Sequence, residues 1–394
     1  MMLRAREQRR ENDRNKKEKV VVMQPSIWGR LPDELLERII ALLPLRTILA
    51  LRPTCRRFSC LLSSPAFLSL LHAHDSLAFL LLSHPQFSHR CLPLYDPAAD
   101  GWRSVPLPPS STSGSASPSS LLLLSAASGL LLFALGRSSL LVANLLTNAS
   151  KVLPLPAYSA APSSATLVSL PSRSNSTHGY KIFLPCASSD DVFVYDSASL
   201  AWTRFPGFEP VLGRRNPHQG GAFFDGSLYF TTLKPFSTVG FDLQNGAWSV
   251  GVAPPPPEDL AFVRLVGGCS GSREDHLYLV GGVGRDGISR SLKLWELVGR
   301  KGEEGRGRAW EEIGRLPEMM CRKFMSVCYH NYSHVNCLWH DGLVCICCTT
   351  WPEVLFFKVS RGTWHWLPRC PMLQEKWSCG FRWFSFVPDL FALV

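Results

Sequence analysis

The chain has 394 residues, of which 46% are hydrophobic and only 18% are charged. This length fits a small module followed by a large one, or one large repeat domain, and the low charged fraction is typical of a strand-rich protein. The 41 lysine and arginine residues exceed the 31 aspartate and glutamate residues, but the excess is unevenly spread, so it does not by itself indicate a nucleic-acid-binding domain.

Residues 1–24 form a basic tail in which acidic residues are interspersed. We expect this tail to be solvated and disordered, with a nuclear-import or polyanion contact as the alternative. The tail lacks the apolar core and small-residue cleavage site of a secretory signal. We therefore expect a protein of the nucleus or cytoplasm whose cysteines stay reduced.

Residues 25–72 are predicted to form short helices separated by prolines. Pro32 suits the first position of a helix that ends at Pro44, and the acidic residues Asp33 and Glu34 suit the positive end of its dipole. Its apolar residues cover an arc wider than a single core-facing stripe requires. Three further short helices are expected over residues 45–52, from Pro53 and from Ser64.

A helical module of under about fifty residues buries too little apolar surface to be stable alone. The sequence offers no metal or disulfide pattern that would compensate. We therefore expect these helices to bind another chain, with packing on the rest of this chain as the alternative.

The helical module carries apolar residues, prolines and a cysteine at a specific spacing. They are Leu31, Pro32, Leu35, Leu36, Ile39, Leu42, Leu43, Pro44, Cys55 and Phe58. In this pattern the module resembles an F-box, although Phe58 stands where tryptophan is commoner in the family. The resemblance implies that these residues dock on a Skp-type adaptor, which bridges to a cullin, and that replacing Leu31 and Pro32 with alanine removes most adaptor binding.

Beyond residue 75 a weak unit repeats about every fifty residues. In each copy an apolar run is followed by a short turn, a tryptophan and then a proline, except that a lysine replaces the tryptophan in the second copy. The six positions are Trp102, Lys151, Trp202, Trp248, Trp310 and Trp364. We predict that the tryptophans pack between neighbouring repeats.

A second marker follows the same period. Turns are predicted at Gly129, Gly179, Asp225-Gly226, Asp275-His276 and Asp341-Gly342, each followed by an apolar strand. The fifth copy is longer because of an insert at residues 299–308, which we expect to be a surface loop. Short strands at this period predict an all-β propeller of six blades over residues 75–394, with residues 381–387 as the closing strand.

Glycine doublets recur in this region at Gly220-Gly221, Gly267-Gly268 and Gly281-Gly282. With these doublets and the repeat period, the region resembles the kelch-repeat propellers that follow F-boxes in plant ubiquitin-ligase receptors. The resemblance implies a propeller that binds a target protein.

Other candidate sites favour structural interpretations. Cys345, Cys347 and Cys348 are predicted to lie in a buried strand rather than at a zinc site. His72, His74 and Asp75 are predicted to form a polar linker. The uncharged residues 121–135 are too few to span a membrane and are predicted to be buried strands. We expect no metal, no cofactor and no membrane or nucleic-acid partner.

Together the two resemblances imply a non-catalytic substrate-recognition subunit of an SCF-type (Skp–cullin–F-box) ubiquitin ligase, with a helical F-box at residues 25–72. The alternatives are an enzyme that uses the propeller channel and a scaffold without ligase coupling. Two loops are candidates for the target contact, with plain solvated loops as the competing interpretation. They are residues 254–259 and the loop that carries Arg214, Arg215 and His218.

Overall fold

The structure is a computed structural model. The chain folds into two compact units, Met1–Asp75 and Ser76–Val394. The basic tail at residues 1–24 lies outside the described residues. These are 29–43, 47–48, 51, 54–61, 64, 67, 78–85, 87, 91–97, 99–106, 121–147, 149–156, 164–170, 179–186, 191–208, 220–251, 253–256, 258–270, 274–299, 308–328, 331–373, 376, 378–389 and 392–394.

The first unit is helical, as predicted. Helix α3 spans Asp33–Ala41 and helix α5 spans Arg56–Leu61, with helical residues also at 47–48, 51 and 67. Pro32 is the N-cap of α3 rather than its first residue, because its carbonyl accepts the first helical bond, 3.1 Å from the nitrogen of Leu36. The acidic first turn lies at the positive end of the helix dipole, as expected.

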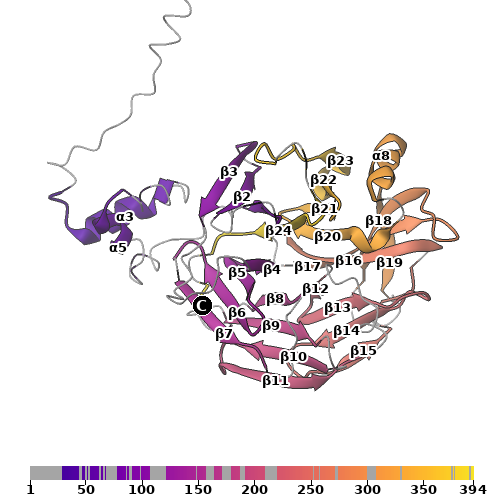
Figure 1. Ribbon diagram of the computed structural model, residues 1–394, viewed down its shortest axis with the longest axis horizontal. Helices are drawn as coiled ribbons and strands as arrows, with labels where there is room; N and C mark the ends of the chain where they lie inside the picture. The colour runs from indigo at the N-terminus through magenta and orange to yellow at the C-terminus, as the bar shows by residue number, and fades with distance from the viewer. Residues whose placement is uncertain are drawn as a thin grey trace, which may run out of the picture. The chain divides into compact units, whose positions relative to one another are not determined.

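The second unit consists of six four-stranded antiparallel sheets, which confirms the predicted six-bladed propeller. In Figure 1 the first strand of each sheet lies near the centre and the fourth lies at the rim. The first blade contains β24 (Arg382–Phe386), β1 (Phe79–Ser83), β2 (Cys91–Asp96) and β3 (Gly101–Pro106).

The remaining blades follow in chain order. The second contains β4 (Leu121–Ala127), β5 (Leu130–Leu135), β6 (Ser139–Asn144) and β7 (Ala149–Pro154). The third contains β8 (Thr166–Leu170), β9 (Gly179–Pro185), β10 (Asp191–Asp196) and β11 (Ala201–Pro206), and the fourth β12 (Ala222–Phe224), β13 (Ser227–Thr231), β14 (Thr238–Asp242) and β15 (Trp248–Val250). The fifth contains β16 (Leu260–Ser270), β17 (Glu274–Val283), β18 (Ser291–Val298) and β19 (Ala309–Arg315), and the sixth β20 (Val335–His340), β21 (Leu343–Cys348), β22 (Trp351–Lys358) and β23 (Thr363–Trp366).

The ring closes through the predicted strand. β24 pairs antiparallel with β1 from Phe386 opposite Phe79 to Arg382 opposite Ser83. Strands from the two ends of the propeller thus share one sheet, which removes the free edge that an open array of blades would leave.

Because each blade is an antiparallel meander, its connections alternate between two faces of the ring. On one face, which we call the turn face, the first strand of a blade joins the second and the third joins the fourth. On the opposite face, which we call the loop face, the second strand joins the third and each blade joins the next. The chain enters β1 and leaves β24 at the turn face.

The predicted turns at Gly129, Asp225-Gly226 and Asp341-Gly342 lie on the turn face, whereas Gly179 is the first residue of β9 and pairs with Leu170. Asp225 and Gly226 have φ values of 47° and 76°, and Asp341 and Gly342 have 43° and 79°. Two successive residues with positive φ form the two-residue hairpin turn that matches strand twist, and aspartate and glycine tolerate this conformation best. The sequence pattern therefore identified these turns for a physical reason.

One predicted turn is wrong. Asp275 and His276 lie inside β17, where they pair with Cys269 and Gly268 of β16. The hairpin instead closes between Ser270 and Glu274, because both strands of this blade extend beyond the usual length. Residues 300–307 of the predicted insert lie outside the described residues.

The fifth and sixth blades are joined by a helix that the sequence pattern did not predict. Helix α8 spans Glu318–Cys328 and buries Cys321, Phe324, Met325 and Cys328, which recur at helical spacing. These side chains join the core formed by the fifth and sixth blades.

Residues 121–135 form the two strands β4 and β5, as predicted. β5 is buried, whereas β4 is only partly buried and exposes Leu122. The cysteine-rich segment forms the buried strand β21, as predicted. No helix in the described part of the chain is both long enough and apolar enough to cross a membrane.

Candidate functional site

Helix α3 has apolar side chains on two faces. Leu36 and Ile40 are buried, with 1% and 0% of their surface exposed. Leu35, Ile39 and Leu42 are exposed at 48%, 37% and 84%, and their spacing aligns them along one line of the helix. We call these three residues the α3 stripe. A second apolar face that is left in solvent is typical of a surface that binds another protein.

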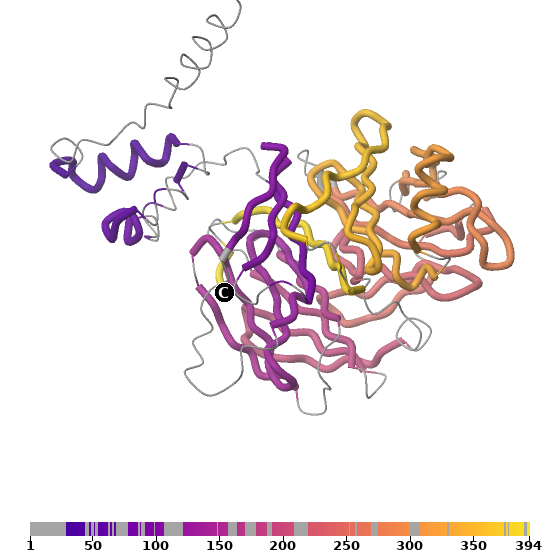
Figure 2. The backbone as a smooth tube through the Cα atoms, turned by 45° about the horizontal axis from the view of Figure 1, so that its top comes forward, coloured from indigo at the N-terminus to yellow at the C-terminus, as the bar shows by residue number. Residues whose placement is uncertain are grey.

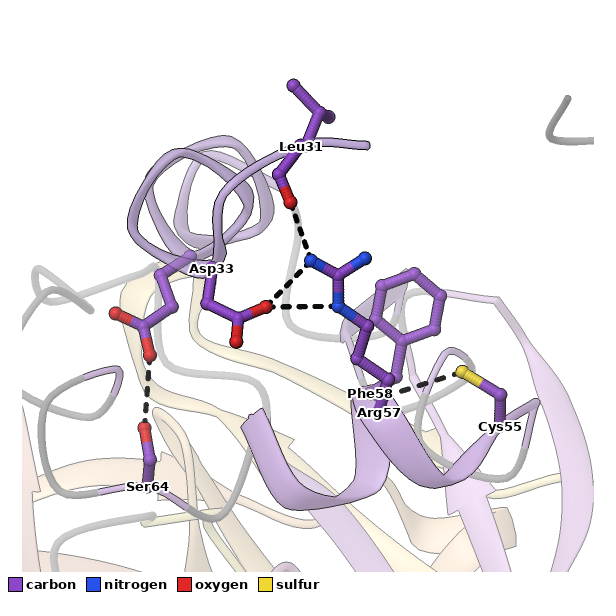
Figure 3. Close-up of polar contacts among 7 residues, drawn as sticks. Leu31, Asp33, Cys55, Arg57, Phe58 and Ser64 are labelled. Atoms are coloured by element: carbon purple, nitrogen blue, oxygen red, sulfur yellow. Dashed lines mark hydrogen bonds and ion pairs between the residues drawn. The ribbon is translucent and has the colours of Figure 1, made fainter. Parts of the chain in front are cut away.

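Polar contacts hold α3 in place from its N-terminal end (Figure 3). Arg57 of α5 donates from Nη2 to the carbonyl of Leu31 at 2.6 Å and to Oδ1 of Asp33 at 2.7 Å. Ser64 donates from Oγ to Glu37 at 3.3 Å and accepts from the nitrogen of Phe67 at 3.1 Å. These contacts fix the orientation of α3 within the helical unit.

The repeat tryptophans join neighbouring blades, as predicted. Four indole nitrogens donate to the carbonyl of the repeat proline in the preceding blade. The pairs are Trp102 to Pro368 at 3.2 Å, Trp202 to Pro154 at 3.1 Å, Trp248 to Pro206 at 2.9 Å and Trp310 to Pro254 at 2.8 Å. The bond from Trp102 joins the first blade to the sixth, so the same contact serves within the ring and at its closure.

The bond is absent from the described residues at two blade junctions. In the second blade Lys151 occupies the tryptophan position, opposite Val142. At the sixth blade the carbonyl of Pro317 instead accepts the nitrogen of Cys321 in α8 at 2.9 Å, and the buried indole nitrogen of Trp364 has no described partner. Helix α8 thus replaces one inter-blade hydrogen bond with apolar packing.

Known proteins resemble this chain in its helical unit and over most of its length. The F-box domain family matches residues 28–70. The F-box/kelch-repeat protein At5g43190 of Arabidopsis thaliana is 46% identical over 383 residues, which cover 94% of this chain and 90% of that protein. The chain belongs to the F-box/kelch-repeat family. It is also 33% identical over 399 residues to the rice protein ABERRANT PANICLE ORGANIZATION 1 (Oryza sativa subsp. japonica), with 93% and 90% of the two chains covered.

Within the F-box, the structure separates the predicted adaptor-binding residues by exposure. Besides the α3 stripe, Pro32 and Cys55 are exposed, whereas Leu31 and Leu43 are half-buried. Leu36 and Phe58 are buried, so we assign them to the core that supports the surface. Pro44 lies outside the described residues.

A clasp at Asn144 holds the C-terminal tail of this F-box/kelch-repeat protein. The buried Asn144 side chain donates to the carbonyls of Asp389 and Ala392 at 3.0 and 2.9 Å, and its oxygen accepts from the nitrogen of Leu146 at 2.9 Å. Figure 2 shows the yellow C-terminal segment beside the magenta strands of the second blade. Asp196 and Asp242 occupy the corresponding place in the third and fourth blades, but a carboxylate could not donate these bonds.

The centre of the propeller contains a cavity of about 390 Å³ lined by the first strands of the blades. Ser385 lines this cavity, and its Oγ lies 3.0 Å from Nδ1 of His340. Burial lowers the pKa of His340 to about 4, and its Nε2 has no hydrogen-bond partner among the described residues. A base this weak is poorly matched to activating a serine near neutral pH. Asp275 and Arg382 also line the cavity.

The remaining predicted candidates give no site within the described residues. Arg214, Arg215 and His218, and likewise His72, His74 and Asp75, lie outside those residues. No group of three or more histidine, cysteine, aspartate or glutamate side chains in the described part could hold a metal ion. Burial raises the pKa of Cys337 to about 12 and also raises that of Cys345, so both thiols are protonated near neutral pH.

Proposed function

We propose that this F-box/kelch-repeat protein is the substrate-recognition subunit of an SCF-type ubiquitin ligase. Its α3 stripe binds a Skp-type adaptor that connects to a cullin, and its propeller binds a target protein. The chain performs no chemistry itself. It raises the concentration of the target near the ubiquitin-transferring machinery, which acts as a proximity effect. We expect it to work in the nucleus or cytoplasm.

The exposed second face of α3 carries this proposal. Helix α3 already buries Leu36 and Ile40 in its own unit, so the α3 stripe is not needed to complete that core. Full burial of an exposed side chain of this size gains roughly 1.5–3 kcal/mol, so Leu42 has the most to gain from a partner, and Leu35 and Ile39 gain less. An amphipathic helix that presents three aligned apolar residues is suited to a complementary helical or grooved partner.

The test is adaptor capture by the full chain after Leu35→Asp and Leu42→Asp are introduced together. Both side chains are exposed, so the fold should be kept while the apolar surface gains two charges. We expect affinity for a purified Skp-type adaptor to fall about 100-fold or more, because central interface anchors are worth about 2 kcal/mol or more each. Leu200→Asp, at an exposed propeller turn, is the matched control and should leave capture unchanged.

Undiminished adaptor capture by the double variant would refute the assignment of the stripe. Failure of the unsubstituted chain to bind any Skp-type adaptor would instead favour a propeller scaffold without ligase coupling.

A further inference from the structure

We infer that the loop face of the propeller binds the target, and that the target presents an acidic segment bearing an apolar side chain. This inference rests on the proposed function, because it assigns a surface and a chemical class to the target of the ligase. It follows from a comparison of the two faces of the ring.

The chain itself occupies part of the turn face. Its C-terminal tail is fixed there by Asn144, and a side chain at Gly129 would come within 2.6 Å of the nitrogen of Asp389. Ala392 and Val394 at the end of the tail pack against the core of the second and third blades. The entry to β1 uses the same face. The loop face carries neither terminus of the propeller.

The acidic residues of the turn face are explained by the backbone. Asp100, Asp225 and Asp341 adopt positive φ in turns. Asp196 and Asp242 accept hydrogen bonds from turn nitrogens, at 2.8 Å from Ala198 and 2.7 Å from Gln244. Turn chemistry alone selects aspartate at such positions. These charges therefore need no binding partner to account for them.

The loop face carries both acids and cations, and its acids near α8 are accounted for within the chain. Asp286 adopts a positive φ of 53° in a turn, and Glu318 forms an ion pair with Arg322. No turn requires the cations.

Arg290 and Arg315 are exposed beside the first turn of α8. The carbonyl of Arg290 lies 3.9 Å from Sγ of Cys321, and Arg315 ends β19 three residues before α8 begins. Neither guanidinium has a carboxylate partner among the described residues. Arg137 and Lys234, in loops of other blades, likewise have none there.

Exposed apolar side chains accompany these cations. Ile288 and Met319 are exposed at 52% and 74%. The loop that carries Ile288 is fixed to the segment after α8, because the nitrogen of Ser289 bonds the hydroxyl of Tyr332 at 2.8 Å. We call Ile288, Arg290, Arg315 and Met319 the blade-five patch. Met319 belongs to α8, which Figure 1 shows at its upper right.

The composition of the patch defines its partner. Two arginines without described partners attract carboxylates and orient them, while exposed methionine and isoleucine gain only from contact with another apolar surface. A nucleic acid would satisfy the arginines but not the apolar residues. An acidic protein segment with an apolar side chain satisfies both.

The test is selection of random displayed peptides against the full chain, followed by fluorescence anisotropy of the enriched peptides. We expect the enriched peptides to be acidic and to contain an apolar residue. The double variant Arg290→Glu and Arg315→Glu should weaken their binding about tenfold or more, because each reversal turns attraction into repulsion. Ile288→Ser with Met319→Ser should weaken it about tenfold through lost apolar contact.

Arg361→Glu is the matched control, because Arg361 is exposed and belongs to the turn-face 3-10 helix Val359–Arg361. It should change peptide affinity less than about twofold. Three results would overturn the inference: enriched peptides without an acidic bias, equal weakening by the control and patch variants, or patch-dependent binding of short duplex DNA that exceeds peptide binding. Adaptor capture, measured on the same samples, should be unchanged, so loss of the target surface is distinguished from loss of ligase coupling.

Discussion

The two units of the chain use apolar side chains in opposite ways. Each propeller blade buries its faces against neighbouring blades, and the ring is closed by the pairing of β24 with β1 and by the bond from Trp102 to Pro368. The helical unit buries one face of α3 and leaves the α3 stripe in solvent. A closed ring of repeats can satisfy its own surfaces, whereas a small module retains a face for a partner. Four predictions test this contrast.

We expect the largest loss of propeller stability from a substitution at Asn144. Asn144→Asp removes both donors to the tail carbonyls and places a carboxylate at a fully buried position. We expect the free energy of unfolding to fall by roughly 4 kcal/mol. Urea unfolding of the full chain, followed by tryptophan fluorescence, measures this loss. The reciprocal change Asp196→Asn in the third blade is the control and should cost less than about 1 kcal/mol.

The second prediction concerns the stability of the fold at low pH. Burial lowers the pKa of His340 to about 4 from an ordinary value of 6.5, so the unfolded chain binds a proton at this site that the folded chain excludes. Neutral His340 therefore contributes fully to the free energy of unfolding above pH 6.5. As the pH falls toward 4, this contribution is lost and the free energy of unfolding falls by about 3 kcal/mol. Urea unfolding between pH 7 and pH 4 should show a smaller decline for His340→Gln than for the unsubstituted chain. An equal decline in both would show that other groups cause the acid sensitivity.

The inter-blade hydrogen bonds predict a smaller difference between two tryptophans. Trp202→Phe loses the bond to Pro154, whereas Trp364→Phe loses an indole nitrogen that has no described partner. Both changes remove the same ring volume. We therefore expect Trp202→Phe to cost about 1 kcal/mol more in the free energy of unfolding. Equal costs would mean that these bonds contribute nothing beyond packing.

The smallest effect is expected in the helical unit. Arg57→Met removes the contacts with Asp33 and Leu31, but Arg57 and Asp33 are partly exposed, so we expect only about 0.5 kcal/mol. Hydrogen exchange of the α3 amides should become about twofold faster. Arg56→Met, which changes an exposed neighbour without a described partner, should leave their exchange unchanged.

The sequence predicted the features that depend on local chemistry or on the repeat period. The aspartate-glycine turns, the blade count, the closing strand and the role of the tryptophans follow from residues that recur at fixed spacing. The displaced turn at Asp275 escaped prediction because strand length in that blade depends on pairing that continues to Ser270 and Glu274. Helix α8 left a signal in the spacing of Cys321, Phe324, Met325 and Cys328, but the repeat period gave no reason to expect a helix between two blades.

The candidate sites were less predictable. The F-box pattern identified the apolar positions of α3, but only the fold shows that Leu36 and Phe58 are buried while Leu35, Ile39 and Leu42 are exposed. The clasp at Asn144 and the blade-five patch join segments that are distant in the sequence. No local pattern could indicate them.

Hydrogen exchange of the full chain with and without a purified Skp-type adaptor tests the contrast between the two units most directly. We predict that the adaptor slows exchange of the α3 amides and leaves the amides of β5, inside the closed ring, unchanged. If α3 exchanges at the same rate with and without saturating adaptor, the helical unit does not offer the binding surface described above.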